Sequence, residues 1–112
     1  MRDSDPALMA GVPELLILKL LAGREMYGYE LAAAIRTVTN EGISLGEGVL
    51  YPALHALEQR GLLRSRRRAV GGRTRIYYSV TAKGTRRLDR LATRWRKISG
   101  AVEAALTGAS HA

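Results

Sequence analysis

The sequence of 112 residues contains no cysteine, no phenylalanine and one tryptophan, and its two histidines are His55 and His111. A chain without cysteine forms no disulfide, no thiolate metal site and no cysteine nucleophile. Two isolated histidines, without paired carboxylates or metal-ligand spacing around them, do not make a catalytic or metal-binding motif. The sequence therefore predicts a protein that is not an enzyme and that uses no cofactor and no metal.

Long apolar runs are also absent. Apolar residues make up 46% of the chain, yet none of their runs approaches the ~20 residues that a membrane-spanning helix needs. The first residues, MRDSDPALMAG, carry two acidic side chains and lack the apolar centre of a signal peptide. We therefore expect a soluble cytoplasmic protein without a membrane partner, and 112 residues suffice for one domain with a modest core.

Acidic side chains are nearly missing from one block of the chain. Residues 1–59 hold four basic and eight acidic side chains, whereas residues 60–97 hold fourteen basic side chains and one acid, Asp89, a net charge of +13. A block of this kind repels itself unless an anionic partner offsets it. Its densest part falls on predicted strands, whereas membrane-surface binding favours one amphipathic helix. We interpret residues 60–97 as a nucleic-acid-binding block.

Three helices are predicted before this block. Residues 12–22 (VPELLILKLLA) are too apolar for one stripe, so this helix should be buried on more than one side. A second helix over residues 26–40 carries Leu31, Ile35 and Val38 at the spacing of a core stripe.

The third helix is predicted to begin near residue 47 and to be closed by Gly61. Pro52 then falls in or just after the first turn, where a proline removes few hydrogen bonds. The two faces of this helix are a core stripe of Leu50, Leu54 and Leu57 and an outward stripe of Tyr51, His55 and Gln59.

Residues 62–81 are predicted to form a β-hairpin, because two runs with β propensity flank Gly71-Gly72, a strong turn signal. Three helices followed by a basic hairpin predict a winged helix-turn-helix over residues 1–81, a mainly α (α+β) fold that binds DNA. The hairpin, which we call the wing, carries Arg64, Arg66, Arg67, Arg68, Arg73 and Arg75.

A long last helix is predicted over residues 81–108, where apolar side chains recur at steps of three and four as in a coiled-coil seam. The chain has too few other helices to cover this stripe, so we expect residues 82–112 to form a homodimer interface and a tail. The seam consists of Leu88, Leu91, Trp95, Ile98 and Val102.

Four motifs stand in order along the chain: YGYE at 27–30, GVLYPAL at 48–54, LEQRGLL at 57–63 and GGRTRIYYSVTAKG at 71–84. Together they closely resemble the PadR family of transcriptional regulators, in the small subclass with one C-terminal helix. The resemblance implies a homodimer that binds a palindromic operator in double-stranded DNA, usually to repress a gene. Some members respond to small aromatic or drug-like effectors bound between the subunits. The resemblance therefore makes Trp95 the candidate effector-binding residue here.

The resemblance places the helix of GVLYPAL in the major groove and Tyr27 near the sugar-phosphate backbone. Where the family commonly has threonine this chain has Val49, which removes a hydroxyl from the groove face. As alternatives, Tyr27 simply packs, Ser44 caps a helix, and His55 is plain polar surface. The predicted DNA-binding residues are Tyr27, Ser44, Gly48, Val49, Tyr51, His55, Arg68, Arg73 and Arg75.

RNA binding, or non-specific nucleic-acid binding by a basic winged helix, is the main alternative function. Sequence-specific RNA modules usually offer exposed aromatic side chains for stacking, and Tyr77 and Tyr78 are candidates. Strand alternation should turn one of these two toward the core. A winged helix that serves only as a protein-interaction module is disfavoured by the +13 block.

Overall fold

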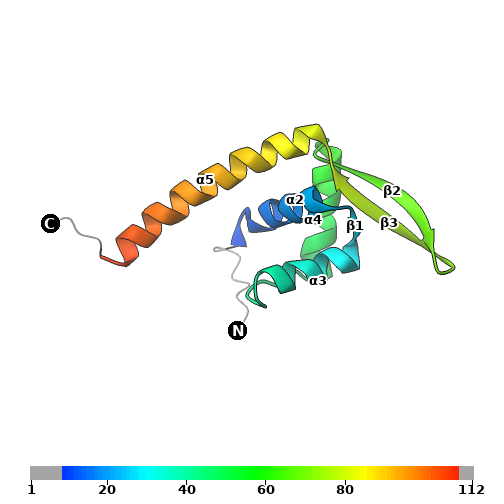
Figure 1. Ribbon diagram of the computed structural model, residues 1–112, viewed down its shortest axis with the longest axis horizontal. Coiled ribbons are helices and arrows are strands. Elements are labelled where there is room, and N and C mark those ends of the chain that lie inside the picture. Colours follow the sequence, from blue (N-terminus) through cyan, green and yellow to red (C-terminus); the bar gives the residue numbers. More distant parts are fainter. Residues whose placement is uncertain (1–8, 109–112) are drawn as a thin grey trace.

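The computed structural model describes residues 9–108, so His111 and the outermost parts of the two predicted units lie outside the described residues. Within the described residues, three helices precede a hairpin and a long last helix, arranged as in Figure 1. This order confirms the predicted winged helix-turn-helix with its long C-terminal helix. The elements are α2 (Val12–Gly23), β1 (Met26–Tyr27), α3 (Gly28–Val38), α4 (Glu47–Gln59), β2 (Leu63–Val70), β3 (Arg73–Val80) and α5 (Ala82–Leu106).

The core lies where α2, α3 and α4 meet the sheet and the first part of α5. Ile17 and Leu18 of α2 are both fully buried, although neighbouring positions point about 100° apart on a helix. This helix is therefore covered from two sides, as predicted. The core stripe of α3 is shorter than predicted, because Leu31 and Ile35 are buried but Val38, the last residue of the helix, is 56% exposed.

Helix α4 begins at Glu47, as predicted, and Pro52 is its sixth residue. The ring nitrogen of Pro52 has no hydrogen to donate to the carbonyl of Gly48, one turn earlier. Both residues are exposed, so water can satisfy that carbonyl. The core stripe is confirmed: Leu50, Leu54 and Leu57 are each at most 2% exposed.

Within residues 9–108, the sheet has three antiparallel strands in the order β1-β3-β2. Strand β1 was not predicted, because residues 26–40 were assigned wholly to a helix. Met26 pairs with Tyr78 and Tyr27 with Tyr77 of β3. A strand of two residues is too short to show the alternation of apolar and polar side chains by which strands are recognised in a sequence. Helix α3 starts only after them, where the carboxylate of Glu30 accepts a hydrogen bond from the Tyr27 backbone N–H at 3.3 Å.

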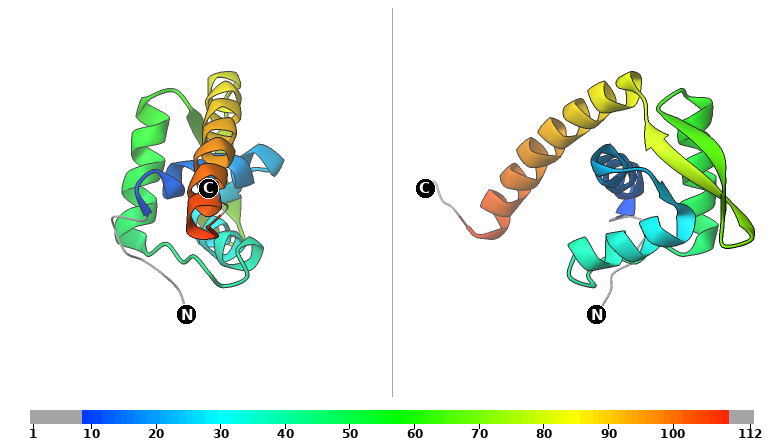
Figure 2. Two further views of the ribbon diagram at one scale, coloured as in Figure 1. Left: turned by 90° about the vertical axis from the view of Figure 1, so that its left-hand side faces the viewer. Right: turned by 45° about the vertical axis from the view of Figure 1, so that its right-hand side comes forward.

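Strands β2 and β3 pair along their full lengths and join through Gly71 and Gly72. Both glycines have positive φ, 57° and 79°, which is the conformation of a tight two-residue hairpin turn and one that other residues adopt at a cost. The predicted hairpin is therefore confirmed with its turn. Its far end reaches away from the helices, and α5 runs in the opposite direction (Figures 1 and 2).

Helix α5 divides into two parts. Near its start, Leu88 is 8% exposed and belongs to the core of the single chain, and Leu91 packs against that core. Further on, Trp95, Ile98 and Val102 are 51%, 61% and 51% exposed. Leu88 therefore offers little surface to a partner, and the exposed apolar side chains of the predicted seam are Trp95, Ile98 and Val102.

The start of α5 depends on a close approach at Gly84, which is buried. A Cβ at this position would collide with the carbonyl oxygen of Leu62 and lie 2.7 Å from Cγ1 of Val80. Backbone cannot move aside as a flexible side chain can, so an added methyl group forces a shift of the helix against the hairpin.

We therefore expect Gly84→Ala to lower the free energy of unfolding by about 1–3 kcal/mol or more. Gly100 in the same helix is a matched control, since nothing lies within 4 Å of an added Cβ there. Gly100→Ala should raise stability by about 0.5–1 kcal/mol. Urea unfolding of both variants measures the two changes in the free energy of unfolding. Equal changes would contradict the steric clash expected at Gly84.

Candidate nucleic-acid interface

The outward face of α4 is open to solvent. Val49 and Tyr51 are 49% and 37% exposed, and His55 is exposed one turn further along. Because the leucines on the opposite face of α4 are fixed in the core, this face is held rigidly. A helix presented in this way can enter the major groove of DNA, which is wide enough to admit it.

The ring of Tyr51 rests on the start of α3. A Cβ at Gly28 would collide with the Tyr51 hydroxyl and lie 2.7 Å from Cζ of that ring. Any residue other than glycine at position 28 would therefore clash with the Tyr51 ring. Tyr51 and His55 line a cavity of ≈ 290 Å³ together with Arg75 and Ile76 of β3. The face of α4 and the wing therefore form one continuous surface.

The two faces of the wing differ in charge. Arg66 lies opposite Tyr77, and Arg68 lies opposite Arg75. Since side chains alternate along a strand and cross-strand partners share a face, the register collects most of the wing's arginines on the face that carries Tyr77. The other face, with Tyr78, meets the core. The arginines that share the Tyr77 face are Arg64, Arg66, Arg68, Arg73 and Arg75.

Tyrosine rings hold two of these arginines in place. The Arg75 guanidinium carbon lies 4.4 Å from the centroid of the Tyr27 ring, and that of Arg68 lies 4.7 Å from the centroid of Tyr77. The two rings meet edge to face, with centroids 5.4 Å apart. Such contacts leave the guanidinium charge intact while they restrict its motion. The predicted residues Tyr27, Arg68 and Arg75 are thus brought together.

A hollow of ≈ 620 Å³ opens beside this stack, lined by Tyr27, Tyr29, Arg73, Thr74 and Arg75. It offers two guanidinium groups and the hydroxyls of tyrosine and threonine, which are the groups that proteins use to bind phosphate oxygens. Tyr29 is 73% exposed and was not among the predicted site residues. Its place in the YGYE motif, two residues after Tyr27, was the signal that pointed to it.

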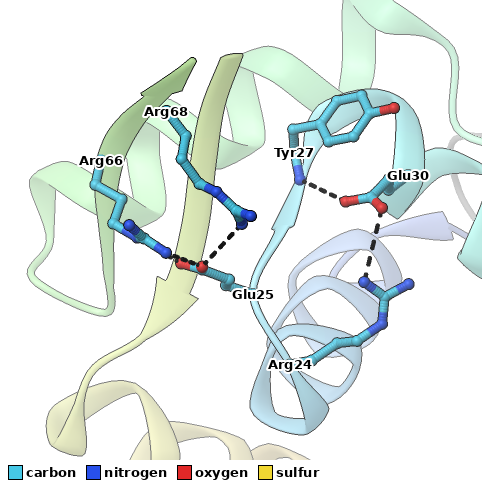
Figure 3. A network of polar contacts seen from close by, with 6 residues as sticks. All are labelled: Arg24, Glu25, Tyr27, Glu30, Arg66 and Arg68. Carbon is cyan, nitrogen blue, oxygen red and sulfur yellow. Dashed lines mark hydrogen bonds and ion pairs between the residues drawn. The ribbon is translucent and has the colours of Figure 1, made fainter. Parts of the chain in front are cut away.

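Two arginines of the Tyr77 face, Arg66 and Arg68, are paired with the carboxylate of Glu25 (Figure 3). Arg66 Nε donates a hydrogen bond to Glu25 Oε2 at 2.9 Å, and its Nη2 donates to Oε1. Arg68 Nη1 lies 3.6 Å from the same Oε1. The pKa of Glu25 is below its ordinary value, chiefly because Arg66 hydrogen-bonds the carboxylate; loss of hydration opposes this, and both positive charges add to it. Sequence reasoning missed Glu25, because 41 residues separate it from Arg66.

A second carboxylate takes two more cations of the basic block. Glu14 of α2 accepts hydrogen bonds from Arg60 at 3.3 Å, just after α4, and from Arg87 of α5 at 2.8 Å. Burial raises the pKa of Glu14, but the hydrogen bonds and charges of Arg87 and Arg60 together outweigh it, so the pKa lies below its ordinary value. These arginines connect three helices, and the basic block is therefore partly structural.

Among the remaining predicted DNA-binding residues, Ser44 is half-buried in the loop between α3 and α4, and Gly48 is exposed in the first turn of α4. The predicted effector residue, Trp95, lines a separate cavity of ≈ 220 Å³. This cavity is apolar for the most part and lies where α5 passes the start of α2. It is lined by Ala10, Gly11, Val12, Leu15, Leu91, Arg94, Trp95 and Ile98.

Within residues 9–108, no cluster of three or more histidine, aspartate or glutamate side chains is arranged to hold a metal ion. Over the same residues, no helix combines the length and apolar character needed to cross a membrane. The site thus consists of the exposed face of α4 and, beside it, a basic wing whose arginines contact tyrosine rings.

Comparison with known proteins gives one consistent match. The model of the Transcriptional regulator PadR-like family matches residues 17–90. Transcriptional regulator Rv3488 of Mycobacterium tuberculosis is 40% identical over 70 residues, which are 62% of this chain and 63% of the relative.

Solved structures extend the similarity to most of the chain. A transcriptional regulator from Clostridium thermocellum, Cth-833, has a TM-score of 0.80 at 28% identity, over 87% of this chain and 95% of that chain. A PadR family transcription regulator from hypervirulent Clostridium difficile R20291 has a TM-score of 0.75 at 31% identity, over 86% of this chain and 99% of that chain.

Proposed function

This chain belongs to the PadR-like family of transcriptional regulators, and we propose that it is a sequence-specific repressor that binds a palindromic operator as a homodimer in the cytoplasm. The observation that carries the proposal is the surface shared by α4 and the wing. Tyr51 and His55 line the same cavity as Tyr27 and Arg75, so the residues that would read bases adjoin those that would grip phosphates.

The proposed roles divide between the two elements. Val49, Tyr51 and His55 face the base edges in the major groove, where sequence is read. Arg73 and Arg75 contact phosphates from the wing, which positions the protein without reading sequence. Tyr27 supports Arg75 through its ring and directs its own hydroxyl toward the sugar-phosphate backbone of the DNA.

The proposed dimer forms through the exposed part of α5. Trp95, Ile98 and Val102 make an apolar stripe on this helix, and such a stripe on a soluble protein normally meets a partner. Two-fold symmetry then places two reading helices about 34–36 Å apart, one turn of B-DNA, so the operator should be an inverted repeat.

We also propose that the cavity beside Trp95 accepts a planar aromatic effector. Its lining comes from α5 and the segment that begins α2, so a bound ligand would alter how these helices meet. Trp95 is the only tryptophan, and quenching of its fluorescence in a titration with planar aromatic compounds would report binding directly.

RNA binding is less well supported than DNA binding. Tyr77 and Tyr78 were the candidates for stacking on bases, but they are only 7% and 3% exposed. One faces the core, and the other is covered by Tyr27 and Arg68. A filter-binding competition between duplex DNA and RNA of equal length tests this choice, and preferential retention of RNA would reverse it.

The reading role of α4 predicts different results for two substitutions. Tyr51→Phe keeps the ring that rests on Gly28 and removes one hydroxyl, so it should weaken operator binding by roughly 1–3 kcal/mol if that hydroxyl contacts a phosphate or a base edge. His55→Ala should relax the preference at one symmetric base-pair position and leave random duplex binding nearly unchanged. Selection from a randomised operator library measures both, and profiles identical to the wild type would exclude this stripe as the reader.

A further inference from the structure

We propose that Glu25 stands in for a DNA phosphate: it occupies Arg66 and Arg68 in the free protein and so limits the sequence-independent grip of the wing on DNA. This inference rests on the DNA-binding function proposed above and assigns a role to a residue outside the predicted site. Glu25 lies in the short connection between α2 and β1, and its carboxylate projects toward the wing (Figure 3).

The contact has the geometry of an anion-binding site that is already filled. Arg66 meets the carboxylate of Glu25 through two of its nitrogens, Nε and Nη2, and Arg68 approaches the same carboxylate from one side. The planar guanidinium group of arginine binds carboxylate and phosphate in this same forked manner. A phosphate placed where the carboxylate of Glu25 lies would therefore make the same hydrogen bonds.

The arginines remain within reach of a competing anion. Their side chains are 57% and 48% exposed, whereas that of Glu25 is 28% exposed. Ion pairs this exposed contribute little to folding stability, so removing the charge of Glu25 should free both arginines without unfolding the hairpin. Arg68 is also the cross-strand partner of Arg75, which lines the hollow beside Tyr27. The occupied arginines thus adjoin the proposed phosphate grip.

The consequence concerns the affinity for random DNA. Phosphate contacts strengthen binding to every duplex equally and carry no sequence information. A protein with a +13 block risks being retained on random DNA, and each occupied arginine lowers that risk. Glu25 would therefore lower the affinity for operator and random duplex by the same factor, and it would shorten the time that the protein spends on random DNA.

The test compares Glu25→Gln with Glu103→Gln in the full chain. Glutamine keeps the shape of Glu25 and removes its charge. Glu103→Gln changes the net charge equally, but at an exposed position in the last turn of α5, and α5 runs away from the wing toward that end (Figure 1). The measurement is the dissociation constant for a random duplex and for a selected operator over a series of salt concentrations.

We expect Glu25→Gln to bind the random duplex about tenfold or more tightly at 0.1 M salt, with a slope of log K against log salt steeper by about 1.8, one added phosphate on each of two wings. The operator-to-random ratio should stay the same, because an added phosphate contact strengthens both complexes by the same factor. Glu103→Gln should show neither the tighter binding nor the steeper slope. Adding Arg66→Ala and Arg68→Ala to Glu25→Gln removes the two freed arginines. The slope of this triple variant should be no steeper than that of the wild type.

Two results would overturn the role of Glu25. One is a slope for Glu25→Gln equal to that of Glu103→Gln, and the other is weaker binding, which would mean that Glu25 orients the arginines for DNA. Glu25→Ala, with the same expectation, serves as the second variant if glutamine impairs folding. A wild-type protein that binds no duplex at all would instead contradict the proposed function, so the two failures are distinguishable.

Discussion

Replacing Trp95 and Ile98 together by alanine is expected to convert the proposed dimer into monomers and to abolish binding to a palindromic operator. Both side chains are more than half exposed in the single chain, and in the proposed dimer they would pack against the partner. Removing such side chains from a buried interface costs about 3–5 kcal/mol for tryptophan and 2–5 kcal/mol for isoleucine. The dissociation constant of the dimer should therefore rise by about three orders of magnitude or more.

Thr93→Ala is the matched control, since Thr93 is exposed on α5 outside the apolar stripe. It should leave the dimer intact. Sedimentation velocity measures the oligomeric state, and gel shifts with a full inverted repeat and with a single half-site separate loss of the dimer from loss of the reading surface. A wild-type protein that sediments as a well-behaved monomer at micromolar concentration would rule out the dimer and the palindrome together.

Much of the fold could be predicted from local sequence signals. The leucines of α4 recur at the helical period, and Gly71-Gly72 allows the positive φ angles of a two-residue turn. Both signals act within a few residues. Strand β1 could not be predicted in this way, because Met26 and Tyr27 are extended only through pairing with β3, more than 45 residues later in the sequence.

The residue types of the site could be predicted from the sequence, but the ion pairs between its residues could not. The excess of arginine over acid marks the wing, and strand alternation predicts two faces. No local pattern reveals that Glu25 occupies Arg66, or that Glu14 occupies Arg60 and Arg87. Such contacts depend on how distant elements meet. The same holds for Leu88, whose position in the heptad predicts a seam although the core of the single chain already buries it.

The burial of Tyr77 shows the limit of a pattern argument most clearly. Alternation predicts that only one of Tyr77 and Tyr78 faces the core, and this is so: Tyr78 belongs to the core. Tyr77 is nevertheless buried on the other face, by the ring of Tyr27 and the guanidinium of Arg68. A basic face that covers its own aromatic rings presents charge to a partner and little stacking surface, which suits a phosphate backbone.

The double substitution of Arg73 and Arg75 by alanine should have the largest effect on DNA binding as a whole. Both side chains line the hollow beside Tyr27, and Arg75 is held over the Tyr27 ring. If each contacts one phosphate, a dimer loses four contacts, and the slope of log K against log salt should flatten by about 3.6. Affinity for any duplex should then fall about 10³-fold or more at 0.1 M salt.

The control removes equal charge elsewhere. Arg90 and Arg96 are exposed on α5, so their replacement by alanine lowers the net charge by the same amount without touching the wing. That variant should lose affinity only modestly, through the weaker overall field, and should keep nearly the wild-type slope. Because the lost contacts carry no sequence information, Arg73→Ala/Arg75→Ala should also select the same operator as the wild type. Isothermal binding measurements between 50 and 200 mM salt would decide it: a wild-type slope in the wing variant would mean that the phosphates are held by other residues.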